Sequence, residues 1–591
     1  AVIPPGYDSV TIGDIERTRL NHIRILFFIG VNDGIIPKAA NAGGIISEYE
    51  RELLAEKMEL APGAREQAFI QRFYLYRNLT KPSEKLYVSY AKVDSEGKAI
   101  RPSYLTGVLR KLFPTLKLQE PEHMEAHTDF YTKEAAEDYL VFGPHEEAWY
   151  ALARWFLQEN DMQKQEKIRK LLHAPYTRYE GEPISRAVAL ALYGRHPYGS
   201  ITRLERFAAC AYAHFLQYGL KLTERETSAF ESVDMGNIYH TALERYSRKL
   251  EQSEYDWFVV PDAVRRQMAE NAMQEAIAGY PGMAVCDTAE NAYQRKRMLA
   301  IFDQTVWALT RQVRAGQFVP EKFEVTFDEL EGKESLEYRL SHDVTMRLEG
   351  RIDRLDTFED ENKISIKVID YKSGNTKFDL IRVYRGLQLQ LVVYMDAAME
   401  MLRGQHPKKE ILPGGILYYH IDDPVLESDT PLSDEEAEQA LLFALRPDGL
   451  VNSGEEIYRA MDQNFEGKSQ MIPVEIKKNG EISAARSKVA STEEFAVITR
   501  YVEHEIRQCG EAIYAGNIAV NPYRSDIETS CTYCPYGSVC GMDAKIPGYE
   551  YRQFASMKKE EVLDQMQTEL ARNRGKEERS DGMDEGTAER H

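Results

Sequence analysis

Two aspartates and a lysine near the middle of the chain have the types and spacing of a metal-dependent hydrolytic centre. Asp353 lies in the segment LEGRIDRL, and Asp370 and Lys372 lie at the end of the segment KISIKVIDYK. A divalent cation requires clustered oxygen ligands, and a phosphodiester under attack requires a cation that neutralises its charge. The three side chains therefore predict a centre that hydrolyses phosphodiesters. An Asp-x-Lys pair also occurs by chance on solvated strands, so the motif alone does not exclude a surface role.

Two paired strands could aim these side chains at one metal ion. Alternating apolar residues predict two strands, joined by a polar turn over residues 359–362. Asp353 then faces away from the apolar residues of its own strand, which are Val344, Met346, Leu348 and Ile352. Asp370 and Lys372 share a face with the apolar residues of the second strand, which are Ile364, Ile366 and Val368.

Two helical patterns flank the predicted strands. Residues 235–250 carry the apolar stripe of a buried helix, and His240 lies beside that stripe. Residues 383–402 form a second pattern, in which Gln390 and Tyr394 share a face at i, i+4. A histidine in such a helix is more often a core residue than a ligand, so His240 is informative only together with the other motifs.

The order of these motifs resembles the RecB-type nuclease domain of the PD-(D/E)xK superfamily. The chain carries G-x-x-x-H ending at His240, then G-x-I-D-R, I-D-Y-K-x-G and Q-x-x-x-Y, the last beginning at Gln390. Four motifs in one order are much more specific than any single motif. The resemblance implies an α/β nuclease fold that binds Mg²⁺ and acts on DNA.

The resemblance also implies a role for each motif residue. Lys372 would orient the attacking water or stabilise the transition state, and Gln390 and Tyr394 would position the DNA backbone. Glu324, in the strand-like segment PEKFEVTF, stands roughly where the family has a glutamate. The implied Mg²⁺ ligands are the side chains of His240, Asp353 and Asp370 and the carbonyl oxygen of Tyr371.

Three of the six cysteines are crowded into one C-x2-C-x5-C segment. Three thiolates complete neither a tetrahedral zinc site nor an iron-sulfur cluster, so a fourth ligand must come from elsewhere. Cys210, in an amphipathic helix expected over residues 200–222, is the candidate. The spacing leaves zinc and iron-sulfur open. A resemblance to the four-cysteine staple of AddB-type subunits implies a [4Fe-4S] cluster bound by Cys210, Cys531, Cys534 and Cys540, whereas Cys286 and Cys509 fit neither pattern and are expected to be buried or inert.

The first 119 residues form a different unit. An apolar run over residues 23–31 predicts a buried parallel strand, residues 47–58 a helix, and residues 85–91 a second strand. These segments resemble the second motor domain of superfamily 1 helicases, which has a RecA-like fold. Lys81 stands where active relatives carry an arginine, and the sequence has no G-x-x-x-x-G-K-[ST] phosphate loop. The expected unit is a degenerate remnant that does not hydrolyse ATP.

Composition and charge complete the domain plan. The chain has 591 residues, 43% of them hydrophobic, and no apolar run of the ~20 residues that a membrane span requires. Few cysteines and no secretory signal favour a cytoplasmic protein, and the first residues, AVIPPGYDSV, are typical of the interior of a longer polypeptide. We expect a helicase-like unit, connecting helices, a nuclease domain and a charged, partly disordered tail, over residues 1–119, 120–195, 196–550 and 551–591.

The formal net charge of −21 is unusual for a protein that contacts DNA phosphates. Local charge matters more than the sum, and Lys377, Arg382 and Arg385 follow the catalytic strand directly. These residues predict either a basic rim around the metal centre or an ordinary solvated loop.

The whole pattern resembles the C-terminal half of the AddB subunits of bacterial AddAB-type helicase-nucleases. The resemblance implies an Mg²⁺-dependent DNA exonuclease subunit, paired with an ATP-driven AddA-type subunit, that processes double-strand ends for recombinational repair. It would cut the 5′-ended strand. The alternatives are a free-standing iron-sulfur nuclease of the Cas4-like kind, against which the helicase-like unit counts, and a non-catalytic DNA-binding scaffold, against which the intact Asp353, Asp370 and Lys372 set counts.

Overall fold

The structure, a computed structural model, divides into two compact units, Ala1–Ile168 and Arg169–His591. The division falls within the segment that we expected to form connecting helices. Each unit mixes helices and strands, as the sequence predicts for an α/β protein. The structure describes residues 10–584 except 19–20, 39–49, 52–53, 55–56, 59, 95–97, 121–131, 144–145, 159–160, 177, 196–197, 224–231, 281–288, 328–336, 342–343, 375, 429–430 and 527.

The first unit contains a two-stranded parallel sheet. Its strands β1 and β2 lie within the two runs that the sequence predicts to be strands, and helix α2 connects them. A small core beneath the sheet includes Phe28, Val31, Leu75 and Leu105. Most of the helix expected over residues 47–58 lies outside the described residues. The elements are β1 (Ile25–Phe28), α2 (Ala64–Leu79), β2 (Lys85–Val88), α3 (Tyr104–Leu112), α4 (Lys133–Phe142), α5 (Glu147–Gln158) and α6 (Met162–His173), which crosses the division.

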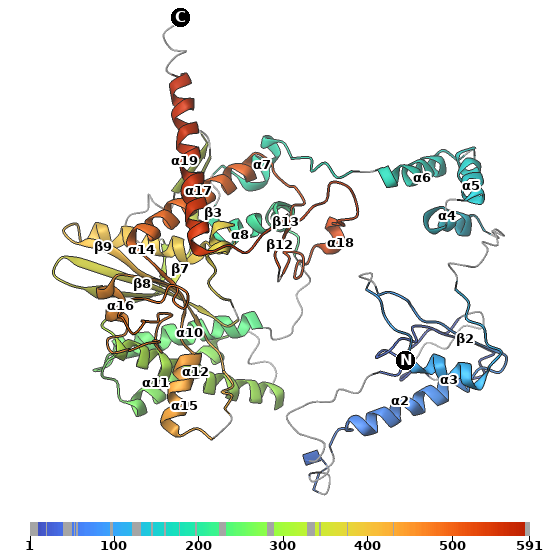
Figure 1. Ribbon diagram of the computed structural model, residues 1–591, viewed down its shortest axis with the longest axis horizontal. Coiled ribbons are helices and arrows are strands. Elements are labelled where there is room, and N and C mark those ends of the chain that lie inside the picture. The colour runs from blue at the N-terminus through green and yellow to red at the C-terminus, as the bar shows by residue number, and fades with distance from the viewer. Residues whose placement is uncertain are drawn as a thin grey trace, which may run out of the picture. The chain divides into compact units, whose positions relative to one another are not determined.

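A six-stranded mixed sheet forms the centre of the second unit (Figure 1). Strands β7 and β8 pair antiparallel through the predicted turn, and β8 pairs parallel with β9. Strand β4 closes one edge by pairing with β7. In spatial order the strands are β11 (Val489–Ala490), β10 (Asp448–Asn452), β9 (Glu410–His420), β8 (Lys363–Lys372), β7 (Arg351–Glu359) and β4 (Val319–Thr326).

Helices cover both faces of this sheet. Ile366 and Val368 of β8 pack in a core with α14 and α17, whereas Ile369 and Tyr371 pack on the other face with α10, α11 and α12 (Figure 1). Because both faces are covered, β8 is buried along most of its length, including the polar residues Ser365 and Asp370. These helices are α10 (Ser232–Glu251), α11 (Asp262–Gly279), α12 (Ala289–Ala315), α14 (Gln390–Gln405) and α17 (Thr492–Tyr514).

A smaller sheet changes one expectation. The residues predicted to form a single strand before Asp353 form two, β6 and β7, which belong to different sheets and are separated by Gly350. A side chain at Gly350 would lie 2.7 Å from the ring of Phe327, so the chain can step between sheets only where that side chain is absent. The second sheet contains β3 (Tyr198–Ser200), β6 (Val344–Glu349) and β5 (Glu337–Ser341).

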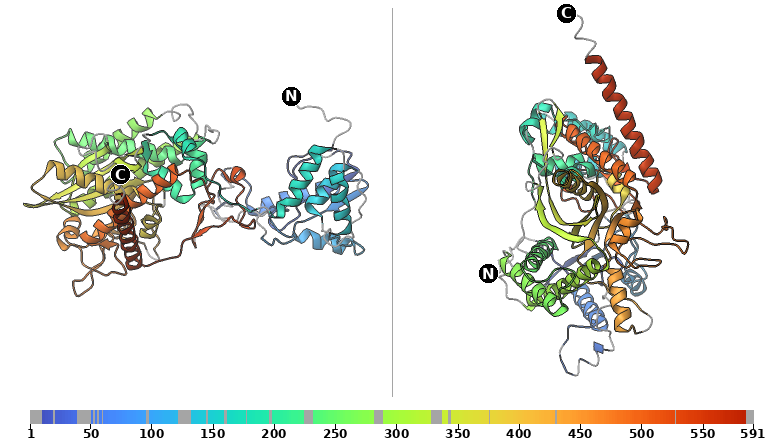
Figure 2. Two further views of the ribbon diagram at one scale, coloured as in Figure 1. Left: turned by 90° about the horizontal axis from the view of Figure 1, so that it is seen from above. Right: turned by 90° about the vertical axis from the view of Figure 1, so that its left-hand side faces the viewer.

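The C-terminal segment contains a long helix. We expect a charged, partly disordered tail over residues 551–591, and the described part of that segment includes α19 (Lys559–Asp584). Val562, Leu563 and Met566 are buried in the core shared with α17, and their helical spacing explains why the first turns are held. The second half of α19 extends beyond the packed helices (Figure 2).

The remaining helices of the second unit are short or peripheral. They are the 3-10 turn Ala174–Tyr176, α7 (Arg186–Tyr193), α8 (Ile201–Ala209), α9 (Ala211–His214), the π-helical turn Phe215–Gly219, α13 (Leu380–Tyr384), α15 (Asp434–Ala444), α16 (Glu455–Met461) and α18 (Gly537–Cys540). Strands β12 (Tyr523–Arg524) and β13 (Arg552–Gln553) form a separate pair. Within the described part of the chain, no helix combines the length and the apolar character of a membrane span.

Candidate nuclease centre

Three acidic side chains lie abreast on three neighbouring strands. Glu324 of β4 lies opposite Asp353 of β7, and the next position of the β7–β8 register places Asp370 opposite Asp353. Opposed residues in an antiparallel pair point to the same face, and adjacent strands are about 4.8 Å apart. The sheet itself therefore builds an acidic row. The pairs that fix this register are Phe323 with Arg354, Val325 with Ile352, and Arg354 with Ile369.

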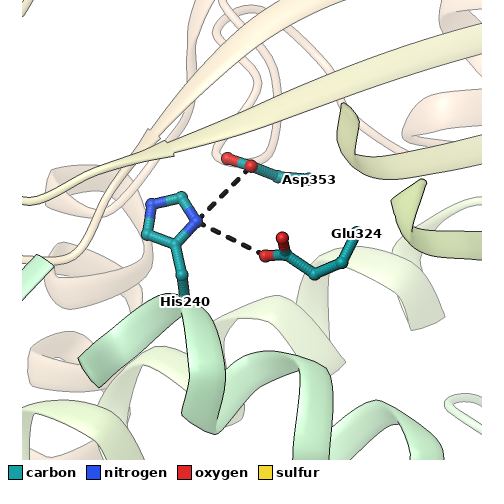
Figure 3. Close-up of side chains that lie close together, drawn as sticks. All are labelled: His240, Glu324 and Asp353. Atoms are coloured by element: carbon teal, nitrogen blue, oxygen red, sulfur yellow. Dashed lines mark ion pairs between the residues drawn. The ribbon is translucent and has the colours of Figure 1, made fainter. Parts of the chain in front are cut away.

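Helix α10 brings His240 to this row (Figure 3). His240 Nδ1 lies 3.4 Å from Asp353 Oδ1 and 3.5 Å from Glu324 Oε1, and its Nε2 lies 3.1 Å from the carbonyl oxygen of Tyr371. One ligand atom from each of His240, Glu324 and Asp353 lies within 4.8 Å of the others. The donor set of one nitrogen and several oxygens suits a hard divalent cation.

The electrostatics of the centre favour a bound cation. Burial lowers the pKa of His240, but contacts with Asp353 and Glu324 outweigh burial and raise that pKa to about 10. Burial and the charge of Asp353 raise the pKa of Asp370 to about 7, although Lys372 opposes the shift. Burial also raises the pKa of Glu324. Without a cation, these carboxylates repel one another and hold a proton on the imidazole.

A chain of polar contacts connects the acidic row to helix α14. Lys372 Nζ lies 2.6 Å from Asp370 Oδ2 and donates to Gln390 Oε1 at 3.1 Å. Gln390 Nε2 in turn donates to the hydroxyl of Tyr394 at 2.8 Å. The lysine, the glutamine and the tyrosine named from the sequence therefore lie in direct contact. Asp353 is fixed from the other side, because its Oδ2 accepts from the backbone N–H of Tyr371 at 2.8 Å.

Glu324 takes a more central place than the sequence indicates, and Arg351 was not identified. The backbone of Glu324 has φ of 51°, a left-handed value uncommon for a residue with a side chain and often found at functional sites. Arg351 Nε lies 2.6 Å from Glu324 Oε2 at the rim of the centre. Arg351 lies in the G-x-I-D-R motif, so its position could have suggested it. The sequence alone does not show that Glu324 lies opposite Asp353. That relationship comes from the pairing register of β4 and β7.

The predicted basic rim is largely occupied by other contacts. Arg382 forms an ion pair with Glu528. The guanidinium of Arg385 lies 4.7 Å from the ring centre of Tyr384 and 4.9 Å from that of Phe554. These contacts favour a structural role for both arginines over a role in contacting phosphate.

The four cysteines of the predicted staple lie near one another. All four are free thiols, and burial together with neighbouring thiols raises the pKa of Cys531 and of Cys540. Cys540 Sγ accepts from the backbone N–H of Met542 at 3.3 Å. The helix expected over residues 200–222 is interrupted at Cys210, whose extended backbone separates α8 from α9. Cys509 is buried, and burial raises its pKa to about 12, whereas Cys286 lies outside the described residues.

Similarity to known proteins covers nearly the entire chain. It is 38% identical over 99% of its length to the B subunit of the ATP-dependent helicase/deoxyribonuclease of Lachnoclostridium phytofermentans, of which it covers 51%. It is also 33% identical to the corresponding protein of Alkaliphilus oremlandii and 31% identical to that of Caldanaerobacter subterraneus, covering 96% and 99% of this chain and 50% and 51% of those proteins. The chain thus spans about half the length of these relatives.

The family profile agrees with the geometry of the centre. Residues 199–541 match the profile described as the PD-(D/E)XK nuclease superfamily. This range contains the acidic row, His240, Lys372 and the four clustered cysteines. The chain belongs to the PD-(D/E)XK nuclease superfamily.

Proposed function

We propose that this chain is the nuclease-bearing part of the B-type component of an ATP-dependent helicase/deoxyribonuclease, and that it hydrolyses DNA with Mg²⁺. The observation that carries the proposal is the acidic row of Glu324, Asp353 and Asp370, with His240 above it and Lys372 beside it. Three carboxylates held together at such a cost in repulsion are typical of a metal centre. The relatives' names supply the substrate class.

The residues present fit a hard divalent cation. His240, Glu324 and Asp353 would bind it, with Asp370 and the Tyr371 carbonyl completing the set. A bound Mg²⁺ would neutralise charge on the phosphodiester and make a water molecule a better nucleophile.

Lys372 supplies the remaining positive charge. Asp370 and Gln390 hold its ammonium beside the acidic row, where it orients the attacking water or stabilises the charge that develops on the phosphoryl oxygens. Gln390 and Tyr394 lie on the same helix face and position the DNA backbone at this end of the sheet.

The four clustered thiols are proposed to bind a [4Fe-4S] cluster. Cys210 and Cys534 pack in one small cluster, and the charges of neighbouring thiols act on Cys531 and Cys540. The choice of an iron-sulfur cluster over zinc rests on the resemblance to the four-cysteine staple of AddB-type subunits.

The first unit is proposed to be a degenerate RecA-like motor remnant. Its parallel strands β1 and β2 and the intervening helix α2 support this assignment, and Lys81 and the missing phosphate loop account for a lack of ATP hydrolysis. An AddA-type partner would supply the motor, and the pair would process double-strand DNA ends in the cytoplasm. The nuclease of this chain would cut the 5′-ended strand.

A cleavage assay with end-labelled linear DNA tests the proposal. The purified chain should degrade DNA with Mg²⁺ and not with EDTA, and Asp353→Asn should remove the activity. Labels on the 5′ and 3′ ends, with and without the ATP-driven partner, report the polarity. A folded wild-type protein that leaves DNA intact at every Mg²⁺ concentration, alone and with its partner, would overturn the proposal.

A further inference from the structure

Helix α14 receives its N-terminal cap from another helix. The first backbone N–H groups of a helix have no partner within the helix, and a side-chain acceptor that satisfies them fixes the first turn. Leu389 provides no such side chain. Instead, Glu205 Oε1 accepts from the backbone N–H of Leu389 at 2.7 Å and from that of Gln390 at 3.3 Å. Glu205 belongs to α8, 184 positions earlier in the sequence.

The capped turn carries the residue that holds Lys372. Gln390 is the first residue of α14, and its side chain joins Lys372 Nζ to the Tyr394 hydroxyl. A frayed first turn would move Gln390, and Lys372 would lose one of its two polar partners. Glu205 is therefore connected to the Lys372 ammonium through a single intervening residue, Gln390.

Helix α8 is itself held firmly. Leu204, Phe207 and Ala208 are buried in the core shared with α14 and α17. The helix ends where Cys210 begins the cysteine site, and Arg206 donates to Cys534 Sγ at 3.6 Å. Arg552 donates to the carbonyl oxygen of Ala209 at 3.0 Å and also to that of Ala208. Glu205 thus projects from an element that is fixed on both sides.

The surroundings of Glu205 argue against a purely stabilising role. Burial raises the pKa of Glu205 to about 7, although the two N–H donors oppose the shift, and the charges of Lys372 and Asp370 act on it in opposite directions. Within the described part of the chain, those two amides are its hydrogen-bond partners. A buried carboxyl with two neutral donors is a costly way to stabilise a fold. This cost in stability is explained if the Glu205 carboxyl must be held where it accepts from the amides of Leu389 and Gln390.

We propose that Glu205 is a positioning residue for the nuclease centre, holding the first turn of α14 so that Gln390 keeps Lys372 beside the acidic row. The inference rests on the nuclease function proposed above. It also connects the cysteine site to the chemistry, because Glu205 and Cys210 lie on the same rigid segment.

Three variants of the full chain test this assignment. Glu205→Ala removes the acceptor, and Glu205→Gln keeps an oxygen that can accept both N–H groups. Ser433→Ala is the matched control, because it removes the side-chain cap of α15, a helix that carries none of the residues named in the centre. Under single-turnover conditions with saturating Mg²⁺, Glu205→Ala should slow cleavage about 10- to 100-fold while the Kd for DNA stays unchanged. Glu205→Gln and Ser433→Ala should cleave within about threefold of wild type.

Hydrogen exchange of the backbone amides at residues 389–392 gives a second measurement that needs no activity. Exchange there should be faster in Glu205→Ala and unchanged in Glu205→Gln. The inference is overturned if Glu205→Ala cleaves as fast as Ser433→Ala, if Glu205→Gln is as slow as Glu205→Ala, or if exchange at the start of α14 does not respond. A wild-type protein without activity would instead count against the nuclease function, and the exchange result would still decide the role of Glu205.

Discussion

Asp370 and Lys372 lie two positions apart on one face of β8, and their charged groups meet at 2.6 Å. The pair lies next to Asp353. Burial raises the pKa of Asp370, and the negative charge of Asp353 raises it further. Asp370 is therefore attracted to the lysine and repelled by the other aspartate. The pair is typical of a centre that binds a cation rather than of an ion pair selected for stability.

Replacement of Asp370 by asparagine should separate activity from stability. We expect cleavage to fall about a thousandfold or more, because the proposed metal centre loses a charged ligand. The metal-free protein should be at least as stable as wild type, since repulsion with Asp353 disappears. Cleavage and thermal unfolding in EDTA measure the two effects. Near-normal cleavage by folded Asp370→Asn would contradict its catalytic assignment.

Replacement of His240 by alanine should have a milder effect. A neutral imidazole contributes less than a carboxylate to binding of a hard cation. We expect the Mg²⁺ concentration for half-maximal cleavage to rise about tenfold, with recovery of much of the rate at high Mg²⁺. A rate that does not respond to added metal would exclude His240 as a ligand.

Removal of one thiol should affect the whole cysteine site. Cys534→Ser should give a colourless, aggregation-prone protein with weakened DNA binding, because the site closes the two ends of the nuclease domain. Anaerobically purified wild type should be brown, with about four irons per chain. A colourless wild-type protein with one zinc per chain would support the four-cysteine site but contradict the iron-sulfur cluster. A stable wild-type protein without metal would contradict both.

The attachment of α19 should weaken as the pH rises through about 7. Burial, aided by Glu569 and opposed by Tyr501 and Arg385, raises the pKa of Glu505 to about 7. The Tyr501 hydroxyl lies within 3.1 Å of Glu505 Oε1, Glu569 Oε2 and the Tyr384 carbonyl, three acceptors for one proton. Protonated Glu505 can donate to this hydroxyl.

The sign of this effect follows from linkage. A carboxyl whose folded pKa is raised contributes stability that is complete below its ordinary pKa and is lost as pH rises through the folded value. Hydrogen exchange over residues 559–573 should therefore be faster at pH 8 than at pH 5 after correction for intrinsic rates. Glu505→Gln should remove the difference, and an equal difference in both proteins would contradict the assignment.

The chain alone should hydrolyse no ATP. Lys81 follows the C-cap residue of α2, Thr80, at the position where the resemblance to helicases implies an arginine in active motors. Lys81→Arg should not create activity, because a phosphate loop is also missing from the sequence. Steady-state phosphate release that survives further purification would contradict this prediction.

The motif residues of the centre could be predicted because each lies in a local pattern. Strand alternation places Asp370 with Lys372, and helical spacing places Gln390 with Tyr394; the structure agrees with both. The strand before Asp353 was predicted as one piece because its apolar alternation continues through Gly350. Only packing against Phe327 reveals the break.

Other contributions depend on contacts between distant segments. Glu205, which the sequence did not indicate, reaches α14 from another helix, and Glu324 joins the acidic row only through the pairing of β4 with β7. The charged composition of residues 559–584 concealed the few apolar residues that hold α19 in place. The average composition of α19 is charged, but its attachment to the core depends on a few apolar side chains, Val562, Leu563, Met566 and Leu570.

Residues that contact α8 are synthesised long after α8 itself. Arg206 meets Cys534 across 328 positions of sequence, and Ala209 meets Arg552 across 343. At ribosomal rates of about 5–20 residues per second, the partners of α8 emerge on the order of half a minute after it. During that interval Cys210 is a free thiol and the apolar side of α8 lacks its C-terminal cover. Chaperone occupancy and thiol protection of the nascent chain are therefore most critical before the last cysteine leaves the ribosome.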